Sequence, residues 1–287
     1  MKKWISIILE LNKVRITVAV TLTTMAGYIL AKGTIDSGII LPVLGIFILA
    51  CGSAAINHIQ DNDKDAIMER TSKRPIPSGD LSLKMAWLIA ISQISLGSFL
   101  IYYGSGFLAM QLGILALIWY NGIYTPLKRK TAFAVIPGSV IGAIPPLVGW
   151  VAAGGSLSDP RAVVLGLFFF MWQVPHFWLL MLKYGEEYNK AGFPSITSKI
   201  SKQQVKNSTF LWTVATAVSA LMVAMSGLIS LMIFKILILV ASIWLIVIFS
   251  KLIRKQTGEF NPFYYFMRIN YFVLIMILVL SIEPLVN

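Results

Sequence analysis

Asn57-His-Ile-Gln-Asp61-Asn-Asp-Lys-Asp65 is the stretch of this sequence that most constrains the fold. It follows an uncharged run of about twenty residues, the length that a helix needs to cross a bilayer. Four acids and four bases then fall within residues 57–74. The sequence therefore predicts a membrane-spanning helix that ends at a highly charged segment.

The same stretch repeats an oxygen-bearing side chain at every fourth position. On a helix, Asn57, Asp61 and Asp65 lie along one face. An amide and two carboxylates in line are hard oxygen ligands of the kind that Mg²⁺ prefers, so we interpret this face as catalytic and metal-binding. Asp63 falls off the face and is expected to be solvated. An ordinary charged loop between two membrane helices is the alternative.

Three bases follow these acids at Arg70, Lys73 and Arg74. Arginine grips phosphate oxygens with two parallel hydrogen bonds, and lysine supplies a compact positive charge. Beside a Mg²⁺ face, such bases predict the other half of a metal–diphosphate site.

Composition places the chain in the membrane. Of its 287 residues 57% are hydrophobic and only 13% are charged, and the mean hydropathy is +0.79. In soluble domains about a quarter of all residues are charged. We therefore expect an all-α integral membrane protein with a single domain over 1–287. The net charge of +12 does not indicate a nucleic-acid partner, because the bases cluster in short loops between apolar spans. The single cysteine, Cys51, excludes an internal disulfide.

Nine apolar segments are long enough to cross a bilayer, which needs about 20 residues. Residues 85–127 carry no charge and are long enough for two helices, with the turn expected at Tyr103-Gly104-Ser105-Gly106. Pro145-Pro146 is expected to kink or break the fifth span. The other spans are predicted at 14–32, 37–57, 132–153, 162–182, 209–228, 231–250 and 264–283. A very short turn near Gly227 is expected to join the spans 209–228 and 231–250.

The bases predict the orientation of these spans. One side of the predicted topology has only Lys32, Arg161 and Lys235, and the other side holds the rest. The positive-inside rule then puts the N-terminus in the cytoplasm and the C-terminus outside. Most of the acids also fall on the cytoplasmic side, although topology does not require them there, which indicates chemistry at that face.

Two further constellations are predicted on the cytoplasmic side. Tyr120, Tyr124 and Lys128 share a four-residue spacing, and Arg129 follows them. The two tyrosines are candidates to stabilise a developing cation, and the two bases to bind diphosphate. An aromatic belt with flanking topogenic charge is the alternative.

The third constellation is Trp172-Gln-Val-Pro-His176-Phe-Trp178, followed by Glu186-Glu187. Polar residues within an apolar span are expensive, so Gln173 and His176 are expected to have a role there. A hydrogen bond to a carbonyl freed by Pro175 is the structural alternative for both. The acids Glu186 and Glu187 are candidates for a second metal site.

At these residues the chain resembles the UbiA superfamily of intramembrane prenyltransferases, whose first signature is Asn-x3-Asp-x3-Asp. Within it the chain is most similar to the heme branch, the protoheme IX farnesyltransferases. The segments that carry this resemblance are Asn57–Pro75, Tyr124–Thr131, Gly142–Trp150, Trp172–Trp178 and Glu187–Pro194.

The resemblance implies a UbiA-type bundle that transfers a farnesyl group from farnesyl diphosphate to a vinyl group of heme b. Water is added, and the products are heme O and diphosphate. It implies Mg²⁺ as cofactor, and an active site on the cytoplasmic face of a prokaryotic cell (inner) membrane. It also implies that His176, Gln173, Trp178 and His58 are heme-binding candidates, and that a downstream heme-modifying enzyme or oxidase assembly factor is a partner.

The chain departs from the heme branch at Glu187, where the branch usually has aspartate before the tyrosine. Three other functions stay open. They are a UbiA-type enzyme for a quinone precursor or another tetrapyrrole, a non-catalytic heme-handling membrane protein, and a transporter. A transporter would place its charges nearer the bilayer midplane, and a heme-handling protein would leave the Asn57–Asp65 spacing unexplained.

Overall fold

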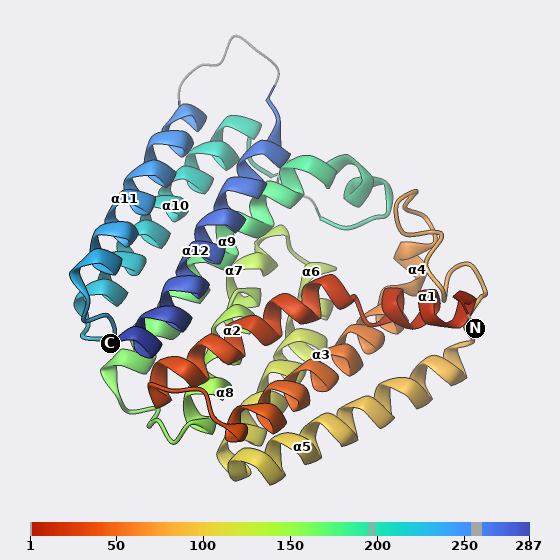
Figure 1. Cartoon of the computed structure of the whole chain (residues 1–287). Coiled ribbons are helices and arrows are strands. Elements are labelled where there is room, and N and C mark those ends of the chain that lie inside the picture. Colours follow the sequence, from red (N-terminus) through yellow and green to blue (C-terminus); the bar gives the residue numbers. More distant parts are fainter. Residues whose placement is uncertain (1, 195, 197–198, 254–259) are drawn as a thin grey trace.

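The computed structural model describes the whole chain except residues 1, 195, 197–198 and 254–259, and within the described part every regular element is a helix (Figure 1). The α-helices are α1 (Lys2–Leu11), α2 (Val14–Lys32), α3 (Ile40–Gln60), α4 (Asn62–Asp65), α5 (Leu83–Leu117), α6 (Thr125–Lys128), α7 (Val135–Gly138), α8 (Val140–Ala152), α9 (Pro160–Lys190), α10 (Lys202–Met225), α11 (Met232–Phe249) and α12 (Pro262–Val286). The shorter elements are 3₁₀ turns at Ser37–Ile39, Ala132–Ala134 and Ser250–Leu252, and a π-helix, η2, at Ile118–Tyr124.

In the described residues, eight helical stretches are long and apolar enough to cross a membrane, and the longest is Leu83–Lys128. This stretch folds back on itself at Gly106, whose φ of +81° suits glycine. A methyl group on Gly113 would lie 3.2 Å from Cδ1 of Ile101. Twelve residues of continuous helix would separate these positions by about 18 Å. Residues 83–128 therefore supply two antiparallel segments, joined at the turn predicted from the sequence.

The fifth predicted span is interrupted upstream of its prolines. The short helix α7 ends at Gly138, Ser139 separates it from α8, and α8 runs through Pro145 and Pro146. The carbonyls four residues before the prolines belong to Ile141 and Gly142, which lie inside α8, so the prolines do not account for this interruption. A break at Pro145-Pro146 was predicted, but the helix continues through both prolines and the break lies at Ser139.

Glycines let α2 and α8 pack with their backbones almost in contact. A methyl group on Gly27 would lie 2.0 Å from the carbonyl oxygen of Pro146, and one on Gly149 would lie 1.9 Å from that of Thr24. Without strong hydrophobic driving force in lipid, helices associate through such close packing of small residues. This crossing fixes the first span of the chain against the centre of the bundle.

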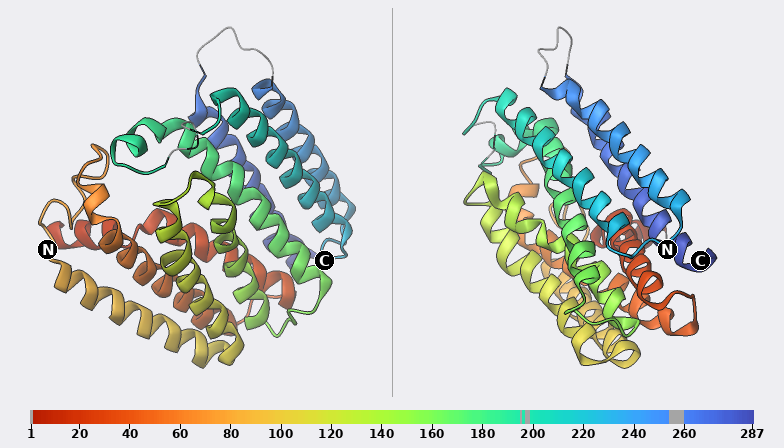
Figure 2. Two further views of the ribbon diagram at one scale, coloured as in Figure 1. Left: turned by 180° about the vertical axis from the view of Figure 1, so that it is seen from behind. Right: turned by 90° about the vertical axis from the view of Figure 1, so that its left-hand side faces the viewer.

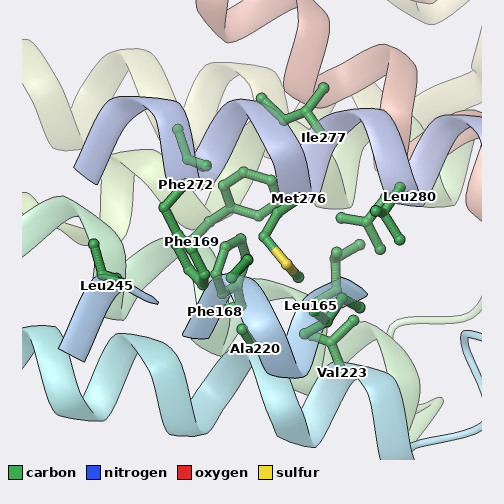
Figure 3. Packing of buried hydrophobic residues seen from close by; sticks show 14 of the residues in the cluster. Leu165, Phe168, Phe169, Ala220, Val223, Leu245, Phe272, Met276, Ile277 and Leu280 are labelled. Carbon is green, nitrogen blue, oxygen red and sulfur yellow. The ribbon is translucent and has the colours of Figure 1, made fainter. Parts of the chain in front are cut away.

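The largest buried cluster lies where α9, α10, α11 and α12 meet (Figure 3). Phe168 packs edge-on against Phe169 and Phe272, with ring centroids 5.0 and 6.3 Å apart. All three rings are fully buried. Aromatic burial of this kind holds α9, which carries the third constellation, in a fixed position against α12.

The charged segments gather at one end of the bundle. α1, α4 and the C-terminal turns of α9 lie at this end, and the C-terminus lies at the other (Figure 1). Figure 2 shows the same separation of the two termini from behind. The predicted acidic and basic segments therefore meet in space, as a shared site requires.

Candidate active site

The predicted acidic face forms at the junction of α3 and α4. The backbone N–H of Asp61 donates to the carbonyl of Asn57 at 3.0 Å, and that of Asp65 donates to Asp61 at 2.7 Å. The four-residue spacing thus continues across the junction, and the three side chains are 2, 5 and 2% exposed in chain order. Nδ2 of Asn57 also donates to Oδ2 of Asp61 at 3.0 Å. Buried carboxylates are costly without partners, so this face needs cations.

Basic side chains from three segments supply those cations. Their positive charges compensate the buried carboxylates. The pairs are Lys13 with Asn57, Lys128 and Arg129 with Asp61, and Arg74 with Asp65, the last at 2.7 Å.

Asp63 lies off this face, as its position in the helix predicts. Its side chain is 60% exposed, and Nη2 of Arg129 lies 2.7 Å from its Oδ1. Hydrogen bonding from this guanidinium lowers the pKa of the Asp63 carboxyl. Asp63 therefore forms an exposed ion pair with Arg129 at the rim and does not belong to the buried acidic face.

Lys13 is a member of the site that sequence reasoning did not single out. It links α1 to α2 with a φ of +46°, a left-handed conformation that is uncommon outside glycine. Its ammonium group donates to Oδ1 of Asn57. Burial lowers the pKa of this ammonium to about 7, and the positive charges of Arg74 and Lys128 act in the same direction.

The helix that carries the two tyrosines widens into a π-turn over Ile118–Tyr124, just before Pro126. The N–H of Thr125 donates to the carbonyl of Tyr120, five residues back. In the same register the carbonyl of Asn121 would bond to residue 126, but proline has no N–H. Nε2 of Gln60 donates a hydrogen bond to this free carbonyl at 2.8 Å. π-Turns are frequent at functional sites, and here the turn brings α3 and η2 together.

The side chain of Asn121 completes this connection. It is 5% exposed, accepts from Oγ of Ser53 at 2.6 Å, and donates to the Ser53 carbonyl at 3.0 Å and to Oε1 of Gln60 at 3.2 Å. A second link runs from Nδ2 of Asn57 to Oγ1 of the buried Thr125, at 3.1 Å. The acidic face and the tyrosines are therefore held by one network.

Asn121→Ala is expected to lower the free energy of unfolding by about 2 kcal/mol, because it leaves buried partners on Ser53 and Gln60 unsatisfied. Turnover is expected to fall about tenfold, since the tyrosines lose their fixed place beside the metal face. Thermal melting in detergent and initial rates measure the two effects. Asn207→Ala is the control, since Asn207 is exposed and pairs only along its own helix with Gln203. Equal melting temperatures for the Asn121→Ala and Asn207→Ala variants would contradict this role for Asn121.

Aromatic rings lead from the acidic face to the third constellation. Lys128, paired with Asp61, lies 5.8 Å from the ring centre of Tyr124, and Tyr120 stacks on Tyr124 at 5.8 Å. Tyr124 then lies 5.8 Å from Phe177. The next ring is His176, 5.6 Å from Phe177. Residues from two distant segments, η2 and α9, thus form a continuous aromatic surface beside the predicted diphosphate site, and electron-rich ring faces of this kind stabilise cations.

The second acidic cluster approaches the first through Arg70. Nε of Arg70 lies 3.8 Å from Oε2 of Glu187, and its guanidinium lies 4.9 Å from the ring centre of Tyr184. Glu186 is exposed. The segment that follows α9 closes on the same region, because Phe193 lies 5.7 Å from the ammonium of Lys128.

The structure does not bring four other candidates into this group. Trp178 is 3% exposed and packs with Val135, Val174 and Val205. The remaining placements are Gln173 with its amide oxygen over Gly142 of α8, Lys73 exposed on the segment after α4, and His58 fully buried with both ring nitrogens lacking a partner in the described chain.

The donor set at Asn57, Asp61 and Asp65 fits Mg²⁺. Oδ1 of Asp61 is buried and has no hydrogen-bond partner among the described residues, so it is an oxygen available to a cation. In the part of the chain that the structure describes, no group of three or more acidic, histidine or cysteine side chains is arranged to hold a metal ion.

Residues 20–272 match the model of the UbiA prenyltransferase family. The chain belongs to that family. This UbiA prenyltransferase is therefore an integral membrane enzyme, in agreement with its eight described apolar helical stretches.

Curated relatives of this UbiA prenyltransferase include two named protoheme IX farnesyltransferase. That of Geobacter sulfurreducens is 38% identical over 220 residues, which cover 77% of this chain and 81% of the relative. That of Nitratidesulfovibrio vulgaris is 34% identical over 242 residues, 84% of each chain.

Solved structures show the same fold. A structure of digeranylgeranylglyceryl phosphate synthase in membranes is similar with a TM-score of 0.81, at 19% identity over the full length of both chains. A UbiA homolog from Archaeoglobus fulgidus bound to GPP and Mg²⁺ gives a TM-score of 0.74 at 15% identity, covering 98% of this chain and all of that one. The all-α bundle predicted from the sequence is confirmed.

Proposed function

We propose that this UbiA prenyltransferase transfers the farnesyl group of farnesyl diphosphate to a vinyl group of heme b, with addition of water, to give heme O and diphosphate. The observation that carries the proposal is the aromatic surface that joins the Asp61–Lys128 pair to His176. It supports an acceptor site beside a donor site. The names of the curated relatives support heme as the acceptor.

Asn57, Asp61 and Asp65 would hold Mg²⁺, with Glu186 and Glu187 proposed for a second ion. Mg²⁺ bound there neutralises charge on the diphosphate leaving group. The presence of GPP and Mg²⁺ in the Archaeoglobus fulgidus homolog supports this part of the proposal.

The bases of the site act on the leaving group. Lys128, Arg129 and Arg74 exchange a carboxylate partner for a diphosphate oxygen, so positive charge is placed where negative charge develops. The bond between C1 of the farnesyl chain and oxygen breaks, and both electrons leave with diphosphate. Arg70 and Lys73, on the segment after α4, are proposed to assist as the diphosphate binds.

The aromatic residues act on the other fragment. The ring faces of Tyr120, Tyr124 and Phe177 stabilise the allylic cation and keep bulk water from it. The π electrons of the vinyl group form the new bond to C1. Water then adds to the resulting porphyrin-stabilised cation and loses a proton, which leaves a hydroxyl group on the product.

The whole chain is proposed to act as one domain in a prokaryotic cell (inner) membrane, with this site on the cytoplasmic face. The excess of bases at the same end of the bundle supports that orientation. A downstream heme-modifying enzyme or oxidase assembly factor would receive the product.

The test is an assay of the purified protein with heme b, farnesyl diphosphate and Mg²⁺, following heme mass and diphosphate release together. A farnesylated and hydrated heme is expected. Diphosphate release without a heme product would move the acceptor to a quinone precursor or another ring. Tight heme binding without diphosphate release would leave a heme-handling protein.

Removal of divalent cations with EDTA is expected to stop diphosphate release, and added Mg²⁺ to restore it, because the buried carboxylates alone repel the diphosphate. Initial rates across a Mg²⁺ titration measure this dependence. Undiminished release in EDTA would contradict the metal site.

A further inference from the structure

A pair of polar side chains joins α9 to α12 within the membrane-spanning part of the chain. Nδ1 of His176 lies 2.9 Å from Oδ1 of Asn270, and Nδ2 of Asn270 donates to the carbonyl of Phe266 at 2.7 Å. A carbonyl only accepts, so the amide nitrogen faces Phe266 and the amide oxygen faces His176. That oxygen also only accepts, so Nδ1 carries the ring proton and Nε2 carries the lone pair.

Nε2 of His176 is available to a ligand. It has no hydrogen-bond partner among the described residues, and the side chain is only partly buried. The rings of Trp172, Phe177 and Phe266 lie with their centroids 4.9, 5.6 and 4.8 Å from the imidazole. An accessible nitrogen among flat aromatic surfaces suits a metalloporphyrin, which takes an axial imidazole on its iron and packs its ring against apolar groups.

The contact between the two helices continues toward the charged end. Seven residues beyond His176, the ammonium of Lys183 lies 4.0 Å from the ring centre of Phe263, which is seven residues before Asn270. Two helical turns correspond to about 10 Å, so both pairs lie along one antiparallel seam. Among the described residues, Lys183 has no carboxylate partner.

We infer that the seam between α9 and α12 binds the porphyrin acceptor, with Nε2 of His176 on its iron and Asn270 as the positioning residue. Lys183, toward the charged end, receives a propionate. The inference rests on the proposed function for the identity of the acceptor. Hydrogen bonding to Nδ1 fixes the tautomer of a ligating imidazole and makes it a stronger donor to the metal.

The experiment titrates heme b into the purified protein without farnesyl diphosphate, and follows the Soret band and the iron–histidine stretching frequency of the ferrous complex. The wild type is expected to show one axial histidine, and His176→Ala to lose it. Asn270→Leu is expected to weaken heme binding by about 10-fold to 100-fold and to lower that frequency, since the hydrogen bond to Nδ1 is gone. Asn270→Asp keeps an acceptor, so it is expected to restore affinity and to raise the frequency above that of wild type.

The propionate contact is tested with Lys183→Gln. It is expected to weaken binding of heme b but not of heme b dimethyl ester, which has no carboxylates. Lys206→Gln is the matched control, because Lys206 stacks on Phe260 at the same 4.0 Å but lies on α10, and it is expected to leave heme affinity unchanged.

Unchanged iron coordination in His176→Ala would overturn the inference, as would equal frequencies for Asn270→Leu and Asn270→Asp. Equal losses for heme b and its dimethyl ester in Lys183→Gln would overturn the propionate assignment. Turnover is measured separately. A farnesylated heme product with unchanged coordination in His176→Ala rejects only the inference, whereas histidine-ligated heme without any prenylated product rejects only the proposed function.

Discussion

Asp61→Asn is expected to lower kcat/KM for farnesyl diphosphate by about 1,000-fold, equivalent to about 4 kcal/mol of transition-state stabilisation. The substitution keeps the size of the side chain, and the new amide oxygen still accepts from Asn57. It removes the negative charge that is proposed to bind the metal, and it leaves the Lys128 ammonium without its counter-ion. Diphosphate release at fixed Mg²⁺ measures the loss.

Asp63→Asn is the matched control for this change. It makes the same chemical substitution two residues away, on a side chain that is 60% exposed and paired only with Arg129. Its effect on kcat/KM is expected to stay below about threefold, since an exposed ion pair contributes little. Equal losses in the two variants, or near-normal turnover of Asp61→Asn, would reject the metal face. Melting curves separate catalytic loss from unfolding.

Gly149→Ala is expected to destabilise the protein by at least about 3 kcal/mol and to reduce the amount of folded protein in the membrane. The added methyl group would lie 1.9 Å from the carbonyl oxygen of Thr24 and 2.8 Å from the backbone nitrogen of Tyr28. Both neighbours are backbone atoms, so α2 and α8 must separate. Thermal melting in detergent measures the effect, and Gly27→Ala is expected to behave in the same way.

Gly166→Ala provides the control for this packing prediction. Gly166 is also buried and faces α8 from α9, but its added methyl group would lie 3.4 Å from Cδ1 of Leu147, an ordinary contact. Its melting temperature is expected to match wild type or to rise slightly, because alanine favours the helix. Equal melting temperatures for Gly149→Ala and Gly166→Ala would show that α2 and α8 pack less closely than these distances indicate.

Much of the fold and of the acidic face was predictable from local pattern. Apolar run length gives the spans, and the four-residue spacing of Asn57, Asp61 and Asp65 holds because the helical hydrogen bonds continue across the α3–α4 junction. The turn at Gly106 was predictable because a glycine-rich segment divides an uncharged run.

Contacts between distant segments were not predictable in this way. In the sequence, Lys13 resembles any other base that flanks a membrane span and sets its orientation. Only the fold brings it to Asn57. The proposed role of Asn270 depends on its hydrogen bond with His176, which lies 94 positions away in the chain. Trp178 shares a motif with His176, but two helical residues differ by about 200° in direction, so it packs into the core.

The hairpin at Gly106 also bears on how the chain is inserted during synthesis. Its two limbs contain no charged residue between Lys84 and Lys128, so neither limb has an anchor of its own at the turn. Basic residues at both open ends favour retention on the side of the ribosome. The pair is therefore expected to enter the bilayer together as a loop, with Gly106 crossing first. A charge introduced at Gly106 would then hinder insertion of both limbs at once.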